Sequence, residues 1–196
     1  MDVEESFRAY ARARTTALTR IAFLLTADQH LAEDLVQETL LRVAGRWRTI
    51  TSGGDPDPYV RKVLYHQHLA QARRRRIHAI LLARPPERPG PDEPATIARR
   101  VAVHAALASL APRQRAVLVL RYFEDHTEAE TAEILGCRVG TVKSQSRDAL
   151  ARLRLIAPHL ADSTDGGPRP DVVPAPTGPT RRRAAVAELS AEEACR

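Results

Sequence analysis

Apolar residues recur at spacings of three and four over most of the first 157 residues, which is the period of an amphipathic α-helix. The pattern predicts helices over residues 4–25, 29–47, 57–76, 97–110 and 112–125, followed by a helical hairpin over residues 127–154. Long alternating runs of β-branched residues are absent from the sequence. We therefore predict an all-α fold.

The hairpin over residues 127–154 carries the sharpest local signals. Thr127 and Glu130 have the spacing of a capping box, and Gly136 supplies the left-handed position that a tight turn needs. A second helix is expected to open at Gly140, with small, basic and donor-bearing residues on its outer side: Gly140, Thr141, Lys143, Ser144, Arg147 and Ala151. Such a surface suits a recognition helix in a DNA major groove. The alternative is a surface hairpin with an ordinary solvated face.

The helix predicted over residues 29–47 has two unlike faces. One is apolar and must pack inside. The opposite face carries Asp34, Gln37, Glu38 and Leu41 at spacings of three and four. An acidic stripe with one apolar anchor is typical of a docking surface for another protein. A solvated face with a single exposed leucine explains the same pattern, and both interpretations stay open at this point.

The helix predicted over residues 57–76 has a basic outer side with an aromatic residue among the charges. Arg61, Lys62 and Tyr65 lie there together with His68, and the arginine run 73–76 follows. Cations can neutralise phosphates and a tyrosine ring can stack on an unpaired base, so the pattern favours nucleic-acid binding. Arginines at a helix end also complement the helix dipole, but four in a row exceed that need. His66 and His68 have no further ligand at metal-binding spacing.

Composition and charge narrow the class of protein. The formal net charge of the 196 residues is +6, which suggests a polyanionic partner. A proline-rich segment over residues 81–96 is predicted to link two helical domains, residues 1–80 and 97–157, and the low-complexity tail 158–196 is predicted to be disordered. The apolar runs are too short to cross a bilayer and a signal peptide is not evident, so we expect a cytoplasmic protein without membrane insertion.

Catalytic and metal chemistry find little support in the sequence. The phosphate-binding, nucleophile-elbow and zinc-protease motifs are missing, and Cys137 and Cys195 belong to no cysteine or histidine cluster. Cys137 is expected to pack as a small residue in the hairpin turn. We therefore predict neither an enzyme nor a cofactor.

Four segments together resemble bacterial RNA polymerase sigma factors of the extracytoplasmic-function (ECF) type, in particular the SigE-like actinobacterial subfamily. They are AFLLTADQHLAEDLVQETLLRV, DPYVRKVLYHQHLAQARRRR, LAPRQRAVLVLRYFEDHTEAETAEILGC and VGTVKSQSRDALARLR. The resemblance implies that the first domain is sigma region 2, which binds the polymerase clamp and opens and reads the −10 promoter element. It implies that the second is region 4, which reads the −35 element and docks on the polymerase flap.

Residue by residue, the resemblance assigns three surfaces. The polymerase-binding set is Asp34, Gln37, Glu38 and Leu41. The −10 set is Arg61, Lys62, Tyr65, His66, Arg73, Arg74, Arg75 and Arg76. The −35 set is Arg138, Thr141, Lys143, Ser144 and Arg147. Core RNA polymerase and promoter DNA are the implied partners, and the resemblance allows for an anti-sigma factor.

Three positions depart from the usual family pattern. Arg138 stands where a serine cap is usual, His66 where an asparagine is usual, and Asp148 places a negative charge beside the basic face. These positions are expected to affect promoter preference. Other functions remain open on the sequence alone: a helix-turn-helix regulator that binds DNA without polymerase, a sigma-like adaptor that binds only protein, and a DNA-processing enzyme, for which a metal or nucleophile site is missing from the sequence.

Overall fold

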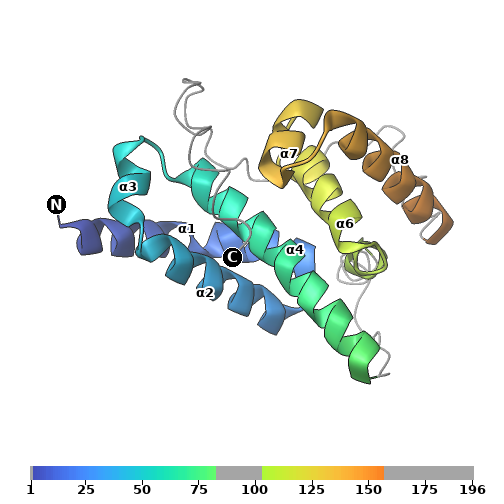
Figure 1. Cartoon of the computed structure of the whole chain (residues 1–196), viewed down its shortest axis with the longest axis horizontal. Helices are drawn as coiled ribbons and strands as arrows, with labels where there is room; N and C mark the ends of the chain where they lie inside the picture. The colour runs from blue at the N-terminus through green and yellow to red at the C-terminus, as the bar shows by residue number, and fades with distance from the viewer. Residues whose placement is uncertain (1, 83–102, 157–196) are drawn as a thin grey trace. The chain divides into compact units, whose positions relative to one another are not determined.

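In the parts of the chain that this computed structural model describes, residues 2–82 and 103–156, the backbone is helical and contains no strand (Figure 1). The first part holds α1 (Val3–Thr26), α2 (Gln29–Ala44), α3 (Trp47–Ser52) and α4 (Asp57–Leu82). In the second part residues 103–108 are helical, and α6 (Pro112–Leu118), the π-helix η1 (Val119–Phe123), α7 (Glu128–Leu135) and α8 (Val139–Ile156) follow. The predicted all-α fold is confirmed.

The break between α1 and α2 lies where the sequence predicts it. Ala27 has a left-handed backbone conformation with a φ of 57°, which ends α1. The side chain of Asp28 then accepts a hydrogen bond of 2.9 Å from the backbone N–H of Leu31 and caps α2. This cap satisfies one of the unpaired donors at the start of a helix.

The end of α2 differs from the prediction. The helix stops at Ala44 instead of reaching Trp47, and Trp47 begins a separate helix, α3, which ends at Ser52. The cause is the tryptophan, which is 2% exposed and packs its ring edge-on against Phe7, with ring centroids 5.2 Å apart. Its indole N–H donates to Ser6 Oγ at 3.2 Å. Burying this side chain against α1 fixes the backbone around it and favours a short helical turn.

The helix predicted over residues 112–125 also changes character along its length. Pro112 takes the first position of α6, where a missing N–H costs nothing. From Val119 the helix widens into the π-helix η1, in which the backbone N–H of Glu124 donates to the carbonyl of Val119 at 3.0 Å. Five-residue spacing inserts one residue into the turn, and such bulges are often found at functional sites.

The capping box and the glycine turn of the predicted hairpin are confirmed. Thr127 Oγ1 accepts from the backbone N–H of Glu130 at 3.2 Å, and Glu130 Oε2 accepts from the backbone N–H of Thr127 at 2.7 Å. Gly136 ends α7 with a φ of 60°. The second helix, α8, begins at Val139, one residue earlier than predicted.

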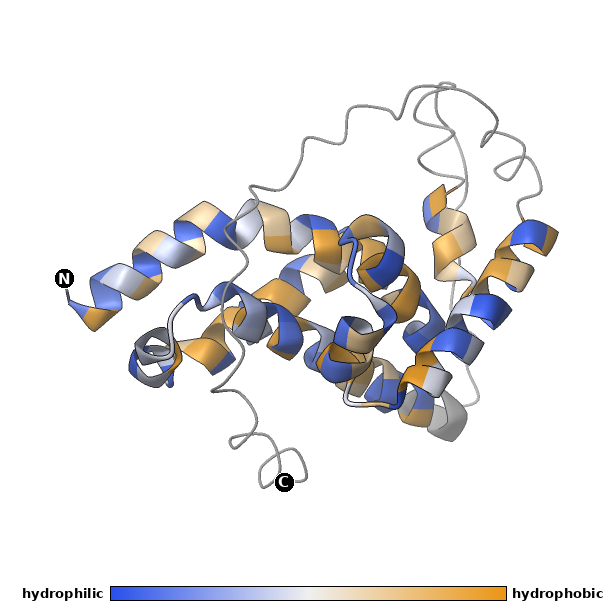
Figure 2. Cartoon of the chain, turned by 90° about the horizontal axis from the view of Figure 1, so that it is seen from above, coloured by the Kyte–Doolittle hydropathy of each residue, from blue (hydrophilic) through white to orange (hydrophobic). Residues whose placement is uncertain are grey.

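The larger of two apolar clusters runs through both described parts, which belong to one compact unit. Side chains from α1, α2 and α4, including Leu18, Leu35 and Leu64, share a cluster with Val117 and Leu120 of the second part. The helices show hydrophobic and hydrophilic sides in Figure 2. None of the described helices is long and apolar enough to span a membrane. The tail 158–196 and, apart from its first two residues, the linker 81–96 lie outside the described residues.

Candidate functional site

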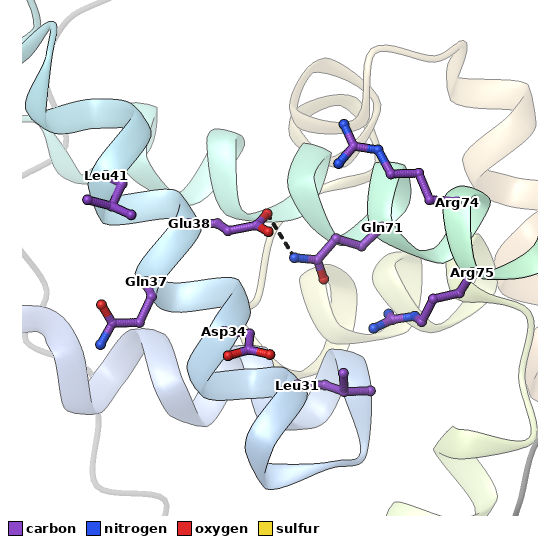
Figure 3. A pocket seen from close by; sticks show the side chains of 8 residues that line it. All are labelled: Leu31, Asp34, Gln37, Glu38, Leu41, Gln71, Arg74 and Arg75. Atoms are coloured by element: carbon purple, nitrogen blue, oxygen red, sulfur yellow. Dashed lines mark hydrogen bonds between the residues drawn. The ribbon is translucent and has the colours of Figure 1, made fainter. Parts of the chain in front are cut away.

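The acidic face of α2 is exposed and borders a groove shared with α4. Leu41 is 73% exposed, and Asp34, Gln37 and Glu38 are exposed beside it. The groove is lined by these four residues and by Leu31, Gln71, Arg74 and Arg75 (Figure 3). The structure thus brings together all the residues predicted to bind polymerase.

Acidic and basic side chains both line this groove. Carboxylates stand on the α2 wall, and Arg74 and Arg75 stand on the α4 wall. Gln71 Nε2 donates to Glu38 Oε2 at 3.0 Å and joins the two walls. Sequence reasoning missed Gln71, because the periodicity of α4 assigns it to neither the apolar nor the basic side. A groove with an exposed leucine and charges of both signs can take an apolar side chain and order charged groups around it.

The predicted −10 surface on α4 is arranged differently from the expectation. Tyr65 was placed on the outer side of the helix, but its side chain is 0% exposed. That placement is wrong because the second part of the chain packs over this side of α4. The Tyr65 hydroxyl donates to Glu124 Oε2 at 2.6 Å, and the Arg61 guanidinium is paired with Glu124 Oε1. His68, also expected outside, is 2% exposed.

Arg61 is held by two carboxylates. Its Nε also contacts Asp57 Oδ2 at 3.2 Å, and Asp57 in turn accepts from the Tyr10 hydroxyl at 2.9 Å. Burial lowers the pKa of the Arg61 guanidinium, but Glu124 and Asp57 offset this and raise it, so Arg61 stays charged. Burial, with Glu124 next, raises the pKa of the Tyr65 hydroxyl, which therefore stays protonated as a hydrogen-bond donor.

The other residues of the −10 set are more accessible. His66 is exposed, and its Nε2 donates to the backbone carbonyl of Ile134 at 2.8 Å. Lys62 is half-buried, and Arg73, Arg74, Arg75 and Arg76 are all exposed. A metal role finds no support among residues 2–82 and 103–156, where no three His, Cys, Asp or Glu side chains gather to hold an ion.

The predicted −35 surface lies at the start of α8. Arg138, Lys143 and Arg147 are exposed, whereas Thr141 and Ser144 are half-buried. Val142 and Ala149, both 0% exposed, hold the opposite face of α8 against the rest of the fold. The positive charges therefore face outward, as a helix that approaches DNA requires.

Acidic residues accompany two of these cations. Lys143 Nζ lies 3.7 Å from Glu128 Oε2, and Arg147 Nε lies 3.4 Å from Asp148 Oδ1. Gly140 has open space where a Cβ would be, so a side chain could be added there. Cys137 is a free thiol, half-buried against the core, as its predicted packing role requires.

Comparison with known proteins agrees with this arrangement. The family model "Sigma-70 region 2" matches residues 7–77, and "Sigma-70, region 4" matches residues 100–153. The chain is 40% identical over 156 residues to the RNA polymerase sigma-E factor of Streptomyces coelicolor, covering 79% of this chain and 88% of that one. It is 33% identical over 161 residues to the ECF RNA polymerase sigma factor SigL of Mycobacterium tuberculosis, covering 78% and 89%.

A solved structure shares the fold. It is the sigma factor RpoE of Bartonella quintana, in complex with the anti-sigma factor NepR, with a TM-score of 0.65 at 23% identity over 83% of this chain and 99% of that one. The order of helices, the two family regions and the similarity to curated relatives all point the same way, and they do not favour a regulator that works without polymerase. The chain therefore belongs to the RNA polymerase sigma factors of the ECF type, the SigE-like proteins that direct polymerase to promoters.

Proposed function

We propose that this chain binds core RNA polymerase through the α2–α4 groove and reads promoter DNA at two points. The observation that carries the proposal is Leu41, which is 73% exposed among acidic neighbours at the rim of the groove. Leaving a leucine side chain in water forgoes about 1.5–3 kcal/mol that burial would give. A partner that covers Leu41 would recover that free energy, and the surrounding acids would orient it toward a basic surface.

The −10 element is assigned to α4. Arg61, Lys62 and His66 supply donors, and Tyr65, which the second part of the chain covers in this structure, would supply a ring for an unpaired base once α4 is uncovered. Stacking contributes about 1–3 kcal/mol per base, so captured bases would drive strand opening by binding free energy alone. Arg74 and Arg75 line the groove, and we assign them to the polymerase side, whereas Arg73 and Arg76 stay on the DNA side.

The −35 element is assigned to α8. Arg138 precedes α8, and Thr141 and Ser144 lie in its first turns, so we assign these three to base edges in a major groove and Lys143 and Arg147 to phosphates. Because such contacts release counterions, binding of promoter DNA should weaken steeply as salt rises. We propose residues 1–80 and 97–157 as the two DNA-binding domains and 81–96 as their linker.

The partners follow from this assignment. Core polymerase, through its clamp and flap, and promoter DNA are the primary ones. The RpoE structure contains an anti-sigma factor, and this chain can be tested for an inhibitor of that kind. The factor would make no covalent bond itself, so we propose an initiation factor and not an enzyme, acting in the cytoplasm where polymerase and DNA are.

Run-off transcription with purified core polymerase and a library of promoters tests the proposal. We expect defined transcripts from a subset of templates only when the chain is added. Core polymerase alone is the control. If the chain adds no initiation above that control on any template, the proposed function is wrong.

A further inference from the structure

Glu124 stands at the centre of the contact between the two described parts of the chain. Its side chain is 3% exposed, and both carboxylate oxygens are used. One oxygen pairs with the Arg61 guanidinium, and the other accepts from the Tyr65 hydroxyl at 2.6 Å. The Glu124 carboxylate of the second part thus binds two groups on α4 that are assigned to DNA, the Arg61 guanidinium and the Tyr65 hydroxyl.

A second contact uses the same face of α4. His66 Nε2 donates to the backbone carbonyl of Ile134, at 2.8 Å, near the end of α7. The second part therefore supplies two acceptors, the Glu124 carboxylate and the Ile134 carbonyl. The donors on α4 are the Arg61 guanidinium, the Tyr65 hydroxyl and the His66 ring N–H. These acceptors match the chemistry of phosphate oxygens and base carbonyls, which are the acceptors that nucleic acid presents.

The arrangement is incompatible with stacking on Tyr65. Its ring is 0% exposed, so a base cannot reach it while the second part covers α4. Arg61 cannot neutralise a phosphate while its charge is met by Glu124 and Asp57. Binding of unpaired −10 bases and this packing therefore exclude each other.

We propose that Glu124 is a latch that, together with the shared apolar cluster and the Arg115–Leu25 hydrogen bond, holds the free chain closed, with the second domain occupying the −10 reading face in place of DNA. This inference rests on the proposed function, which assigns that face to the −10 element. In the closed state the free factor binds single-stranded −10 DNA weakly, and docking on polymerase opens it. If the closed state holds about 90% of the molecules, the apparent Kd for the single strand rises about tenfold.

The variant Glu124→Gln tests the latch. Its amide carries no charge to pair with Arg61, which shifts the population toward the open state. We expect its full-length form to bind a single-stranded oligonucleotide with the non-template −10 sequence severalfold, and at most about tenfold, more tightly than wild type, by fluorescence anisotropy. Glu133→Gln is the matched control, because it makes the same charge change at an exposed position of α7. Equal affinities for wild type and Glu124→Gln would overturn the latch.

Run-off transcription at saturating core polymerase separates this inference from the proposed function. Polymerase opens both forms, so Glu124→Gln should initiate within about twofold of wild type. If wild type fails to initiate, the proposed sigma function is wrong. If wild type initiates but Glu124→Gln binds single-stranded DNA no better, only the latch is wrong. A Glu124→Gln variant that loses initiation while staying folded would contradict the latch, because the residue would then be needed in the open complex.

A measurement on wild type keeps the latch testable if the variant fails to fold. Tetranitromethane modifies accessible tyrosines, and peptide mass spectrometry locates the nitro groups. Tyr122 is 59% exposed and serves as the internal standard, whereas Tyr65 is 0% exposed in the closed state. We expect Tyr65 to be nitrated at least tenfold more slowly than Tyr122 in the free chain. Equal rates would overturn the closed state without any variant.

Discussion

Arg115 Nη1 donates a hydrogen bond of 2.8 Å to the backbone carbonyl of Leu25, which lies in the last turn of α1. Carbonyls in the last turn of a helix have no partner within the helix, so a buried one needs a donor from elsewhere. Arg115 Nη2 also donates to the carbonyls of Ala108 and Leu110, at 2.7 and 3.3 Å. One buried guanidinium thus joins α1, α6 and the turn that precedes α6.

We expect Arg115→Met to lower the free energy of unfolding by about 2–3 kcal/mol, because it leaves buried carbonyls without donors. Urea denaturation followed by circular dichroism measures this. Arg113→Met is the control, because Arg113 lies on the same helix and is exposed. If both variants lose the same stability, the Arg115 hydrogen bonds do not contribute.

His68 gives the fold a dependence on pH. It is 2% exposed, and burial, with the charges of Arg115 and Arg75 next, lowers the pKa of its imidazole from 6.5 to about 4. The unfolded chain therefore binds this proton at a higher pH than the folded chain does. Its contribution to stability is complete above pH 6.5, falls as the pH drops from 6.5 to about 4, and stays constant below.

We expect this residue to account for a loss of about 3 kcal/mol across that range. His68→Leu cannot take up the proton, so its unfolding free energy should fall less than that of wild type between pH 7 and pH 4. Urea titrations at several pH values measure the difference. His30→Gln, at an exposed position, is the control, and parallel pH profiles for wild type and His68→Leu would contradict the assignment.

Local signals in the sequence were enough to predict the start of α2 and both ends of α7, whereas α4 runs to Leu82 and not to residue 76. Asp28, the Thr127–Glu130 box and Gly136 each act on backbone groups a few residues away, so their effect can be read from spacing. The groove on α2 was predictable in part, because an exposed leucine among acids departs from the helical pattern.

Contacts between distant segments were not predictable. Tyr65 and Glu124 are 59 residues apart, and periodicity shows which face of α4 is polar but not what covers it. The π-helix η1 has no visible signal in the sequence, since five-residue spacing over one turn uses the same residue types as an α-helix. The prediction ended the helix 29–47 at Trp47, whereas Trp47 begins α3, because a buried residue at a helix end and one at a helix start give the same pattern.

The capping box at the start of α7 should contribute measurably to stability. Thr127→Ala removes the acceptor for the backbone N–H of Glu130 and leaves half of the reciprocal pair. We expect a loss of about 1 kcal/mol in the free energy of unfolding. Thermal denaturation measures it, with Thr16→Ala on the exposed side of α1 as the control. A Thr127→Ala variant as stable as Thr16→Ala would show that the box contributes nothing.

Leu41→Arg tests the polymerase surface. The residue is exposed, so the fold should be unchanged, whereas a charge replaces the apolar anchor of the groove. If Leu41 is a hot spot worth 2 kcal/mol or more, affinity for core polymerase falls roughly thirtyfold or more. Leu155→Arg is the control, because Leu155 is 83% exposed on α8, away from the groove. Core polymerase titrated with fluorescent factor gives both affinities, and an unchanged Kd for Leu41→Arg would refute the groove as the docking site.

Asp148 should lower the affinity of α8 for −35 duplex DNA. Its carboxylate lies 3.4 Å from Arg147 Nε, so part of the arginine's charge is met within the protein. Exposed pairs of this kind contribute about 0–1 kcal/mol, so Asp148→Asn should strengthen binding to −35 duplex DNA by up to about fivefold. Removing a repulsive charge beside the phosphates adds to the same effect. Glu133→Gln, which makes an equal charge change on the exposed side of α7, separates this local effect from that of net charge. Anisotropy titrations at several salt concentrations give the affinity of both variants for −35 duplex DNA. An equal gain in affinity for both variants would show that Asp148 has no local effect on Arg147.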